Sequence, residues 1–325
     1  MMLPAEKNFK SGWLIREEAE TDWEHGERPE QRTVEENLSN GLVLIDKPAG
    51  VKSHEVSVDI KKFMKRSKAG HSGTLDPDVT GVLPVGIDNA TKVLQALKHA
   101  GKEYKGTMNL SEEFSREKIE EVAEDFIGTV KQTPPEISAV KREEREREVY
   151  GIEIIKVEGG KVDFVIECER GFYVRVFCRQ FGEKLGCDGE LDSLRRTKVG
   201  LFEDDQCVKP EELREQFQLY SDGKDHRLDQ YVRPVEAGVK HLKKVLLKDT
   251  AVSPVCHGAD LGTMGISKLQ EDIEKGETVA LLTLKGELVA IGEALMESEE
   301  MLEGKDTAVE LQRVFLDKDV YPRKW

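Results

Sequence analysis

The sequence has few cysteines, and their spacing does not suit a metal or redox site. Five occur in 325 residues, an odd number without a C-x-x-C pair: Cys168, Cys178, Cys187, Cys207 and Cys256. The seven histidines likewise lack the i, i+4 pairing of a helical metal site. Neither G-x-G-x-x-G nor G-x-x-x-x-G-K-S/T occurs, so no cradle for a nucleotide is expected. We therefore predict free thiols, no metal and no cofactor.

Long apolar runs are missing as well. No stretch approaches the length that crosses a bilayer. The first 22 residues lack the basic start, apolar middle and small-residue cleavage site of a signal peptide. We therefore expect no membrane segment and a cytoplasmic location.

Positive charge is in deficit. Asp and Glu number 64 against 49 Lys and Arg, and the net charge of −15 argues against a simple nucleic-acid coat, because phosphate binding draws on Lys and Arg. Basic residues nevertheless cluster at 61–68, 141–147, 195–198 and 240–244. Taken alone, each cluster is more often a solvated face. Together they are compatible with a basic track on an acidic body.

Strand and helix patterns are mixed in the middle of the chain. The apolar run 42–45 predicts a buried strand, and Ser53 is placed to cap the helix after it. One apolar stripe marks that helix: Val56, Ile60, Phe63 and Met64. Residues 103–110 alternate as in a half-buried strand.

Two further signals indicate the type of sheet. A second amphipathic helix is expected between a Ser115 cap and a terminal Gly128. The strand-like runs 152–157 and 161–168 are joined across a Gly-Gly pair, a strong hairpin signal. Because hairpins are present and no regular βαβ alternation appears, we predict an α+β domain with a mixed, largely antiparallel sheet and flanking helices.

The two ends of the chain differ from this domain. Residues 1–40 are polar and acidic, with Trp13 and Trp23 as the only large anchors, so we expect an arm that lies against another part of the protein. Residues 241–325 contain short strands separated by glycines, which fits a small β-barrel best. The predicted parts are thus the arm, a domain at 41–235 and this C-terminal domain.

Asp76 is the main candidate for chemistry. It lies in HSGTLDPDVTG, where L-D-P alone is a turn signal and most such aspartates are structural. The segment resembles the catalytic motif of the TruB family of pseudouridine synthases. The likeness continues in order through GLVLIDKPAGVKSHEV, EYKGTM, GFYVRVFCRQFGEKLG and LDSLRRTKVG. The archaeal and eukaryotic dyskerin branch is the closer likeness, marked by WLIREEAETD, PPEISAVKREEREREVYGIEI, CHGADL and the final YPRKW.

The resemblance implies a pseudouridine synthase fold with Asp76, Tyr104 and Arg175 as catalytic residues. The reaction breaks the N-glycosidic bond of uridine, turns the base and joins its C5 to the sugar. A carboxylate can act there as nucleophile or charge stabiliser in a pocket that excludes water, with Arg175 supplying the opposite charge. The implied roles of Tyr104 are stacking on the uracil and assistance in proton transfer.

Supporting residues follow from the same resemblance. Tyr173 and the apolar wall Leu194 would line the substrate pocket, while Lys47 and Pro48 would support the active-site tyrosine. RNA contacts are implied for His71, Lys141, Arg142, Arg145, Arg147, His257, Gly258 and Ala259. The last three belong to a PUA-type domain, on which the arm is expected to pack.

The implied function is guided modification. A box H/ACA guide RNA would select uridines in rRNA and tRNA, and three small core proteins would complete the particle: an elongated protein, a β-barrel protein and a kink-turn-binding protein. Two alternatives stay open, a stand-alone enzyme acting on the tRNA T-loop and a non-catalytic RNA-binding scaffold. The arm and the long C-terminal domain argue against the first as the sole role, and the intact catalytic residues argue against the second.

Overall fold

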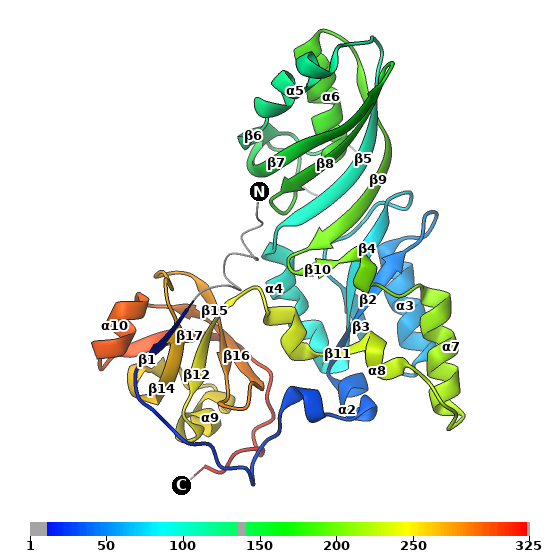
Figure 1. Cartoon of the computed structure of the whole chain (residues 1–325). Coiled ribbons are helices and arrows are strands. Elements are labelled where there is room, and N and C mark those ends of the chain that lie inside the picture. Colours follow the sequence, from blue (N-terminus) through cyan, green and yellow to red (C-terminus); the bar gives the residue numbers. More distant parts are fainter. Residues whose placement is uncertain (1–11, 136–140, 324–325) are drawn as a thin grey trace.

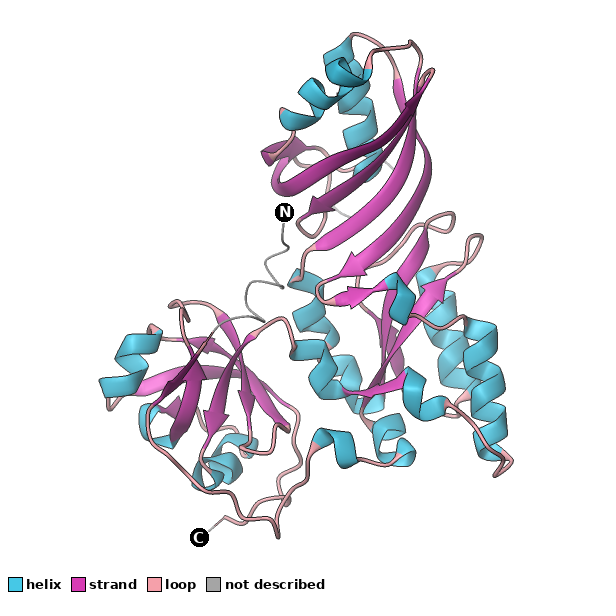
Figure 2. Cartoon of the chain, viewed as in Figure 1, coloured by secondary structure: helices cyan, strands magenta, loops and turns pink. Residues whose placement is uncertain are grey.

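The computed structural model describes residues 12–135 and 141–323, which form two β-sheets with helices packed on them (Figure 1, Figure 2). The expectations made for the start of the arm, for part of the PPEISAV segment and for the last two residues lie outside the described residues. In Figure 1 the larger sheet runs through the right and upper parts of the molecule, and the smaller sheet forms a body at the lower left.

The larger sheet is almost entirely antiparallel. Its main path runs through β11 (Val232–Pro234), β2 (Gly41–Lys47), β4 (Thr80–Ile87), β9 (Gly189–Val199), β5 (Lys102–Leu110), β8 (Lys161–Cys168), β7 (Arg145–Glu158) and β6 (Gly128–Gln132). Two short strands, β3 (Ala69–His71) and β10 (Phe202–Glu203), pair with β4 and β9. Among the named strands of this sheet in the described part of the chain, only β4 and β9 run parallel. The prediction of an α+β domain with a mixed, largely antiparallel sheet is confirmed.

Helices cover both halves of this sheet. They are α2 (Val34–Ser39), α3 (Ser53–Phe63), α4 (Leu94–His99), α5 (Arg116–Glu124), α6 (Val174–Leu185), α7 (Pro210–Ser221) and α8 (Leu228–Tyr231), with the 3-10 turns η1 (Pro29–Gln31), η2 (Asp88–Lys92), η3 (Asp204–Gln206) and η4 (Val235–Val239). In Figure 1, α3, α7 and α8 lie beside β2 and β4, while α5 and α6 lie in the upper lobe with β5 to β8.

Local sequence signals placed most helices and turns correctly, with two errors at helix ends. Ser115 caps α5 as expected, but α5 ends at Glu124, and Gly128 instead opens β6 with a φ of +100°. The N-cap of α3 is Lys52, not Ser53, because the Ser53 hydroxyl is committed to a loop 22 residues away. The Gly-Gly hairpin between β7 and β8 is present.

The smaller sheet is curled into a half-barrel, in agreement with the barrel-like domain expected at the C-terminus. Its strands are, in order, β1 (Trp13–Ile15), β14 (Ile266–Gln270), β12 (Lys243–Leu247), β15 (Thr278–Leu282), β16 (Leu288–Ala294), β17 (Thr307–Val314) and β13 (Leu261–Gly262). The helices α9 (Asp249–Cys256) and α10 (Ser298–Glu303) and the turn η5 (Thr263–Gly265) complete it. One strand, β1, comes from the arm.

The arm is held mainly by its backbone and by polar groups. Trp13 and Trp23 are 47% and 62% exposed, so neither is a buried anchor, although the Lys285 ammonium of the C-terminal domain lies 5.6 Å from the centroid of the Trp23 ring. Instead β1 pairs with β14, and the Arg16 guanidinium donates to three carbonyl groups of the C-terminal domain. Farther along, the Asp22 backbone N–H and the Thr21 hydroxyl donate to Asp249. An edge strand can pair without burying its outward side chains, which explains the exposed Trp13.

A shared core fixes the two sheets relative to each other. Val93 and Leu97, at the end of η2 and in α4, belong to the same buried cluster as Leu288 and Phe315 of the C-terminal domain. Glu236 in η4 adds a polar contact across the junction, since its carboxylate accepts from the Leu288 N–H at 2.9 Å. The same carboxylate pairs with Arg32 of the arm at 2.9 Å.

Candidate active site

Asp76 lies in the loop 72–79 that connects β3 to β4. The loop turns tightly there, because the Val79 N–H donates to the Asp76 carbonyl at 3.1 Å. Arg175, in the first turn of α6, brings Nη2 to 3.2 Å from Asp76 Oδ2. The sheet and α6 thus bring together two residues that are 99 positions apart.

This ion pair is open to solvent. The Asp76 and Arg175 side chains are 57% and 48% exposed. The expectation that the carboxylate sits in a pocket that excludes water is therefore not met by the chain alone. Exclusion of water from this pair requires a bound molecule to cover it.

Two buried side chains hold the loop of Asp76 in place. The Ser53 hydroxyl donates to the Leu75 carbonyl at 3.0 Å and accepts from the Leu75 N–H at 2.9 Å. The Lys47 ammonium donates to the carbonyl oxygens of Pro48, Pro77 and Val79 at 2.8 to 2.9 Å. Burial lowers the pKa of Lys47, with Asp78 and Asp76 acting in the opposite direction. The hydrogen bonds of Lys47 thus support the aspartate loop, whereas the expectation placed its support at the tyrosine.

Tyr104 and Leu194 come from neighbouring strands. Leu194 on β9 pairs with Gly106 on β5, two residues beyond Tyr104 and on the same face of the strand. A side chain at Gly106 would approach Leu194 Cδ1 to 3.1 Å, so the glycine makes room for this contact. Tyr104 and Leu194 both pack, partly buried, on the core of the upper lobe. Burial raises the pKa of the Tyr104 phenol, and the nearby Arg196 lowers it.

Arg196 was missed as a site residue by the sequence reasoning, which grouped it with its neighbours as a basic cluster. It is 1% exposed, and its Nε and Nη2 donate to the carbonyls of Val82 and Gly73 at 2.8 and 3.0 Å. Strand alternation, which places Arg195 and Arg196 on opposite faces of β9, is the signal that separates the two.

His71 ends β3, at the start of the same loop. Its ring is partly buried, and Nδ1 is buried without a hydrogen-bond partner. Burial lowers the pKa of His71, and the positive charge of Arg196 acts in the same direction. The imidazole is therefore favoured in its neutral form.

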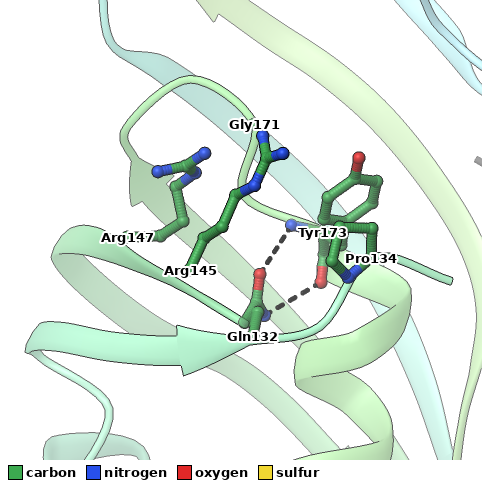
Figure 3. Close-up of a pocket in the computed structure, with 6 residues that line it drawn as sticks. All are labelled: Gln132, Pro134, Arg145, Arg147, Gly171 and Tyr173. Carbon is green, nitrogen blue, oxygen red and sulfur yellow. Dashed lines mark hydrogen bonds between the residues drawn. The ribbon is translucent and has the colours of Figure 1, made fainter. Parts of the chain in front are cut away.

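A small cavity lies beside the N-terminus of α6, lined by Gln132, Pro134, Arg145, Arg147, Gly171 and Tyr173 (Figure 3). Its volume is about 80 Å³. Gln132 fixes the backbone of Tyr173, accepting from its N–H at 2.9 Å and donating to its carbonyl at 3.2 Å. The two arginines project from alternate positions of β7 toward this turn, as Figure 3 shows. Of the neighbouring basic residues, Lys141 and Arg142 are exposed, and Lys141 pairs with Glu143.

The remaining predicted residues lie on the C-terminal domain. His257, Gly258 and Ala259 form an exposed turn after α9, and Gly258 has a φ of +94°. His257 and Gly258 also line a groove of about 880 Å³ that includes Lys92 of the catalytic half. This turn lies between α9 and β13 of the C-terminal domain, whereas Asp76 lies between β3 and β4 of the larger sheet.

In residues 12–135 and 141–323, no group of three or more His, Cys, Asp or Glu side chains is arranged to hold a metal ion. The same described ranges contain no helix that is both long and apolar enough to cross a membrane.

Four family models match consecutive parts of the chain. They are the DKCLD (NUC011) domain at 3–57, the N-terminal domain of the TruB family pseudouridylate synthases at 61–174, the C-terminal domain of tRNA pseudouridylate synthase B at 175–240 and the PUA domain at 243–315. The order is the one that the sequence motifs indicated.

Relatives and solved structures match along the whole chain. The "Probable tRNA pseudouridine synthase B" of Methanocaldococcus jannaschii is 43% identical over 98% of this chain and 95% of its own length. The protein of the same name from Pyrococcus furiosus is 44% identical over 100% and 96%. A chain from a Cbf5-Nop10-Gar1 complex has a TM-score of 0.94 at 44% identity, covering 99% of this chain and 98% of its own.

A second solved structure adds RNA to the comparison. A chain of an H/ACA RNP bound to a substrate RNA containing 2'-deoxyuridine has a TM-score of 0.93 at 42% identity, with full coverage of both chains. Identity above 40% over nearly the entire length, together with the four models in order, leaves one conclusion. The chain belongs to the TruB family of pseudouridylate synthases.

Proposed function

We propose that this protein is the catalytic subunit of a box H/ACA particle and converts guide-selected uridines of rRNA, and of tRNA, to pseudouridine. The observation that carries the proposal is the contact between Asp76 and Arg175, in which α6 delivers a guanidinium to a carboxylate held rigidly by its loop. We infer that its place of action is the cytoplasm, and that it works without a metal or organic cofactor.

In this proposal the catalytic residues have distinct roles. Asp76 reacts with, or stabilises charge on, the nucleoside while the glycosidic bond is broken. Arg175 orients that carboxylate. Tyr104 stacks on the uracil and its hydroxyl assists proton transfer, with Leu194 as the apolar wall beside it and Tyr173 just before the first turn of α6. Lys47 holds the loop by donating to the carbonyls of Pro48, Pro77 and Val79.

In this proposal, bound RNA shields the solvent-exposed ion pair of Asp76 and Arg175 from water. The target uridine must leave its stack to reach Asp76, at a cost of a few kcal/mol. We propose that Arg145 and Arg147 offset part of this cost by binding backbone phosphate near the cavity of Figure 3. Lys141, Arg142 and His71 would add contacts along the same strand of RNA, and water would be displaced as the site closes.

The C-terminal domain holds the guide RNA in this scheme. His257, Gly258 and Ala259 form an exposed turn whose glycine allows close backbone approach. We propose small protein partners like those in the similar complex, which contains Nop10 and Gar1. The resemblance implies that these partners include an elongated protein and a β-barrel protein. The resemblance adds a kink-turn-binding protein on the guide RNA. The three-part division into an arm, residues 41–235 and residues 241–325 belongs to this proposal.

A second candidate function is unguided modification of tRNA. The curated relatives are named tRNA pseudouridine synthase B, which favours tRNA as a substrate in its own right. The two candidates differ in whether a guide RNA is needed, and one assay separates them.

The test is tritium release from RNA labelled at C5 of uridine. Purified protein is given a tRNA transcript or an rRNA fragment, with and without a matching guide RNA and the partner proteins. Release from rRNA only with guide and partners supports the guided role, and release from tRNA without a guide supports the second candidate. No release in any arm, with RNA binding retained, would support the scaffold alternative. Asp76→Asn protein is the negative control.

A further inference from the structure

Arg196 lies where three parts of the active site meet. Strand β9 runs between β5 and β4, so the backbone of Arg196 pairs with Tyr104 on one side and with Gly81 on the other. Its side chain is the largest of the fully buried ones in the described chain. None of the roles proposed above uses it.

The guanidinium bonds to two of these parts and lies beside the third. Nε donates to the Val82 carbonyl on β4 at 2.8 Å, and Nη2 donates to the Gly73 carbonyl, three residues before Asp76, at 3.0 Å. Tyr104 is the cross-strand neighbour of Arg196, so the two side chains lie on the same face of the sheet, and the positive charge acts on the phenol. A Cβ at Gly73 would lie 2.9 Å from Nη1, so the glycine allows the loop to approach the guanidinium. One side chain therefore ties the tyrosine to the aspartate loop.

The charge of this side chain is not neutralised by a carboxylate. Its neighbour Arg195 pairs with Asp46 and Asp204 at 2.8 and 2.9 Å, whereas no carboxylate of the described residues pairs with Arg196. Burying a cation without such a partner is unfavourable to folding. A neutral side chain could link these elements if the role were purely structural. The buried charge of Arg196 therefore requires a functional explanation.

The position of Tyr104 beside Arg196 supplies that reason. Arginine has only N–H donors, so the guanidinium favours the oxygen of the tyrosine and not its hydrogen on the side that faces it. The phenolic hydrogen is then directed away from Arg196, toward a bound base. We propose that Arg196 is a positioning residue that orients the Tyr104 hydroxyl and stabilises negative charge on its oxygen while a proton is shared with the uracil.

The surrounding charges are consistent with this role. Burial raises the pKa of Tyr104, the carboxylate of Asp76 acts in the same direction, and the guanidinium of Arg196 opposes both. Without the guanidinium, negative charge developing on the tyrosine oxygen would be opposed by the Asp76 carboxylate and would not be stabilised by Arg196. Preorganised donors aimed at a developing charge are a common source of rate acceleration.

The inference rests on the proposed function, but its main test does not need turnover. The full-length protein is produced with 3-fluorotyrosine, and the ionisation of Tyr104 is followed by ¹⁹F NMR, its signal assigned by Tyr104→Phe. Arg196→Gln removes the charge while keeping polar reach, and Arg196→Lys keeps the charge. Arg195→Gln is the matched control, since Arg195 is adjacent in sequence and its guanidinium pairs with carboxylates. Circular dichroism establishes that each variant is folded.

We expect Arg196→Gln to move the Tyr104 midpoint upward by about one pH unit or more, with Arg196→Lys intermediate and Arg195→Gln unchanged. Single-turnover rates should fall about 100-fold for Arg196→Gln, less for Arg196→Lys, and RNA affinity should stay the same. An unmoved Tyr104 signal in folded Arg196→Gln overturns the inference, even if the enzyme is active. Absence of turnover in the wild-type protein overturns the proposed function and leaves the titration result standing.

A second variant covers the case in which Arg196→Gln does not fold. Gly73→Ala places a methyl group 2.9 Å from Nη1, and Gly73 has a φ of +72°, so the loop and the guanidinium must shift relative to each other. The Tyr104 signal and its midpoint should then shift. If both stay at their wild-type values in folded Gly73→Ala, the coupling between Arg196 and Tyr104 is absent and the proposal is wrong.

Discussion

The Nη2 atom of Arg175 lies 3.2 Å from Oδ2 of Asp76, with both side chains about half exposed. Exposed ion pairs contribute only about 0–1 kcal/mol to stability. The pair therefore contributes little to the stability of the fold, and we expect its main effect to be on the reaction rate. Removing either partner should leave the fold nearly unchanged and strongly affect turnover.

Asp76→Asn keeps the size of the side chain and removes its charge. We expect loss of turnover by at least three orders of magnitude, about 4 kcal/mol in the barrier, with RNA affinity retained. The measurements are single-turnover tritium release and filter binding on the same protein. Turnover within about tenfold of wild type, or ~1.4 kcal/mol, would contradict the catalytic assignment.

Arg175→Ala should change the free energy of unfolding by less than about 1 kcal/mol and lower the single-turnover rate. Arg179→Ala is the matched control, because Arg179 is one turn farther along α6 and is also exposed and ion-paired, with Glu183. Urea unfolding and tritium release are compared for the two variants. Equal rates in both would show that the contact with Asp76 does not matter for turnover.

Ser53→Ala removes the two hydrogen bonds that hold Leu75 beside Asp76. We expect a loss of roughly 1–3 kcal/mol in stability, because buried backbone groups are left unsatisfied, and a slower reaction with unchanged RNA affinity. Ser57→Ala, also buried in α3 but bonded within its own helix, is the control. If both variants have the same rate, the Ser53 contact does not position the catalytic loop.

Arg145→Gln and Arg147→Gln should weaken RNA binding without altering the fold. Each removed phosphate contact should reduce the slope of log affinity against log salt by about 1. Arg214→Gln serves as control, because Arg214 is exposed on α7 and pairs with Asp59. Fluorescence anisotropy at several salt concentrations gives the slopes. Slopes equal to wild type would remove these two arginines from the RNA contact.

Lys102 makes stability depend on pH. Burial lowers the pKa of Lys102 to about 7, whereas an unfolded lysine keeps a pKa of about 10.4. Between these values the unfolded chain binds more protons at this site, so stability rises with pH, by up to about 1.4 kcal/mol per unit. Lys102→Met should abolish this rise, and Lys105→Met, exposed on the same strand, should not. Urea unfolding at pH 7, 8 and 9 measures this change in the free energy of unfolding. Parallel curves of that free energy against pH for wild type and Lys102→Met would contradict the prediction.

Features set by neighbouring residues were predictable from the sequence. The cap at Ser115 and the hairpin between β7 and β8 depend on contacts a few residues apart, so local patterns indicate them. The approach of Arg175 to Asp76 came from motif resemblance and not from any local rule, since the two lie 99 positions apart.

Features set by distant contacts were not predictable. Ser53 has the composition of a helix cap, yet its hydroxyl is taken by Leu75. Arg196 sits in a run of basic residues that resembles a solvated surface, but it lies between two other strands and is buried. The arm was expected to use its tryptophans because they are its large apolar residues, but both are largely exposed. The arm is attached mainly by backbone pairing and by Arg16, with Trp23 adding a contact to the Lys285 ammonium.

The pairing of β1 with β14 has a consequence for synthesis. Trp13–Ile15 emerges from the ribosome early, but its partner, Ile266–Gln270, is translated only near the end of the chain. Throughout that interval the first strand has an unpaired edge, open to any other extended segment. The smaller sheet reaches its final width only after the larger one is complete. The order of translation therefore leaves the arm unpaired until β14 has been made, and a nascent chain that stalls before Ile266 leaves it exposed.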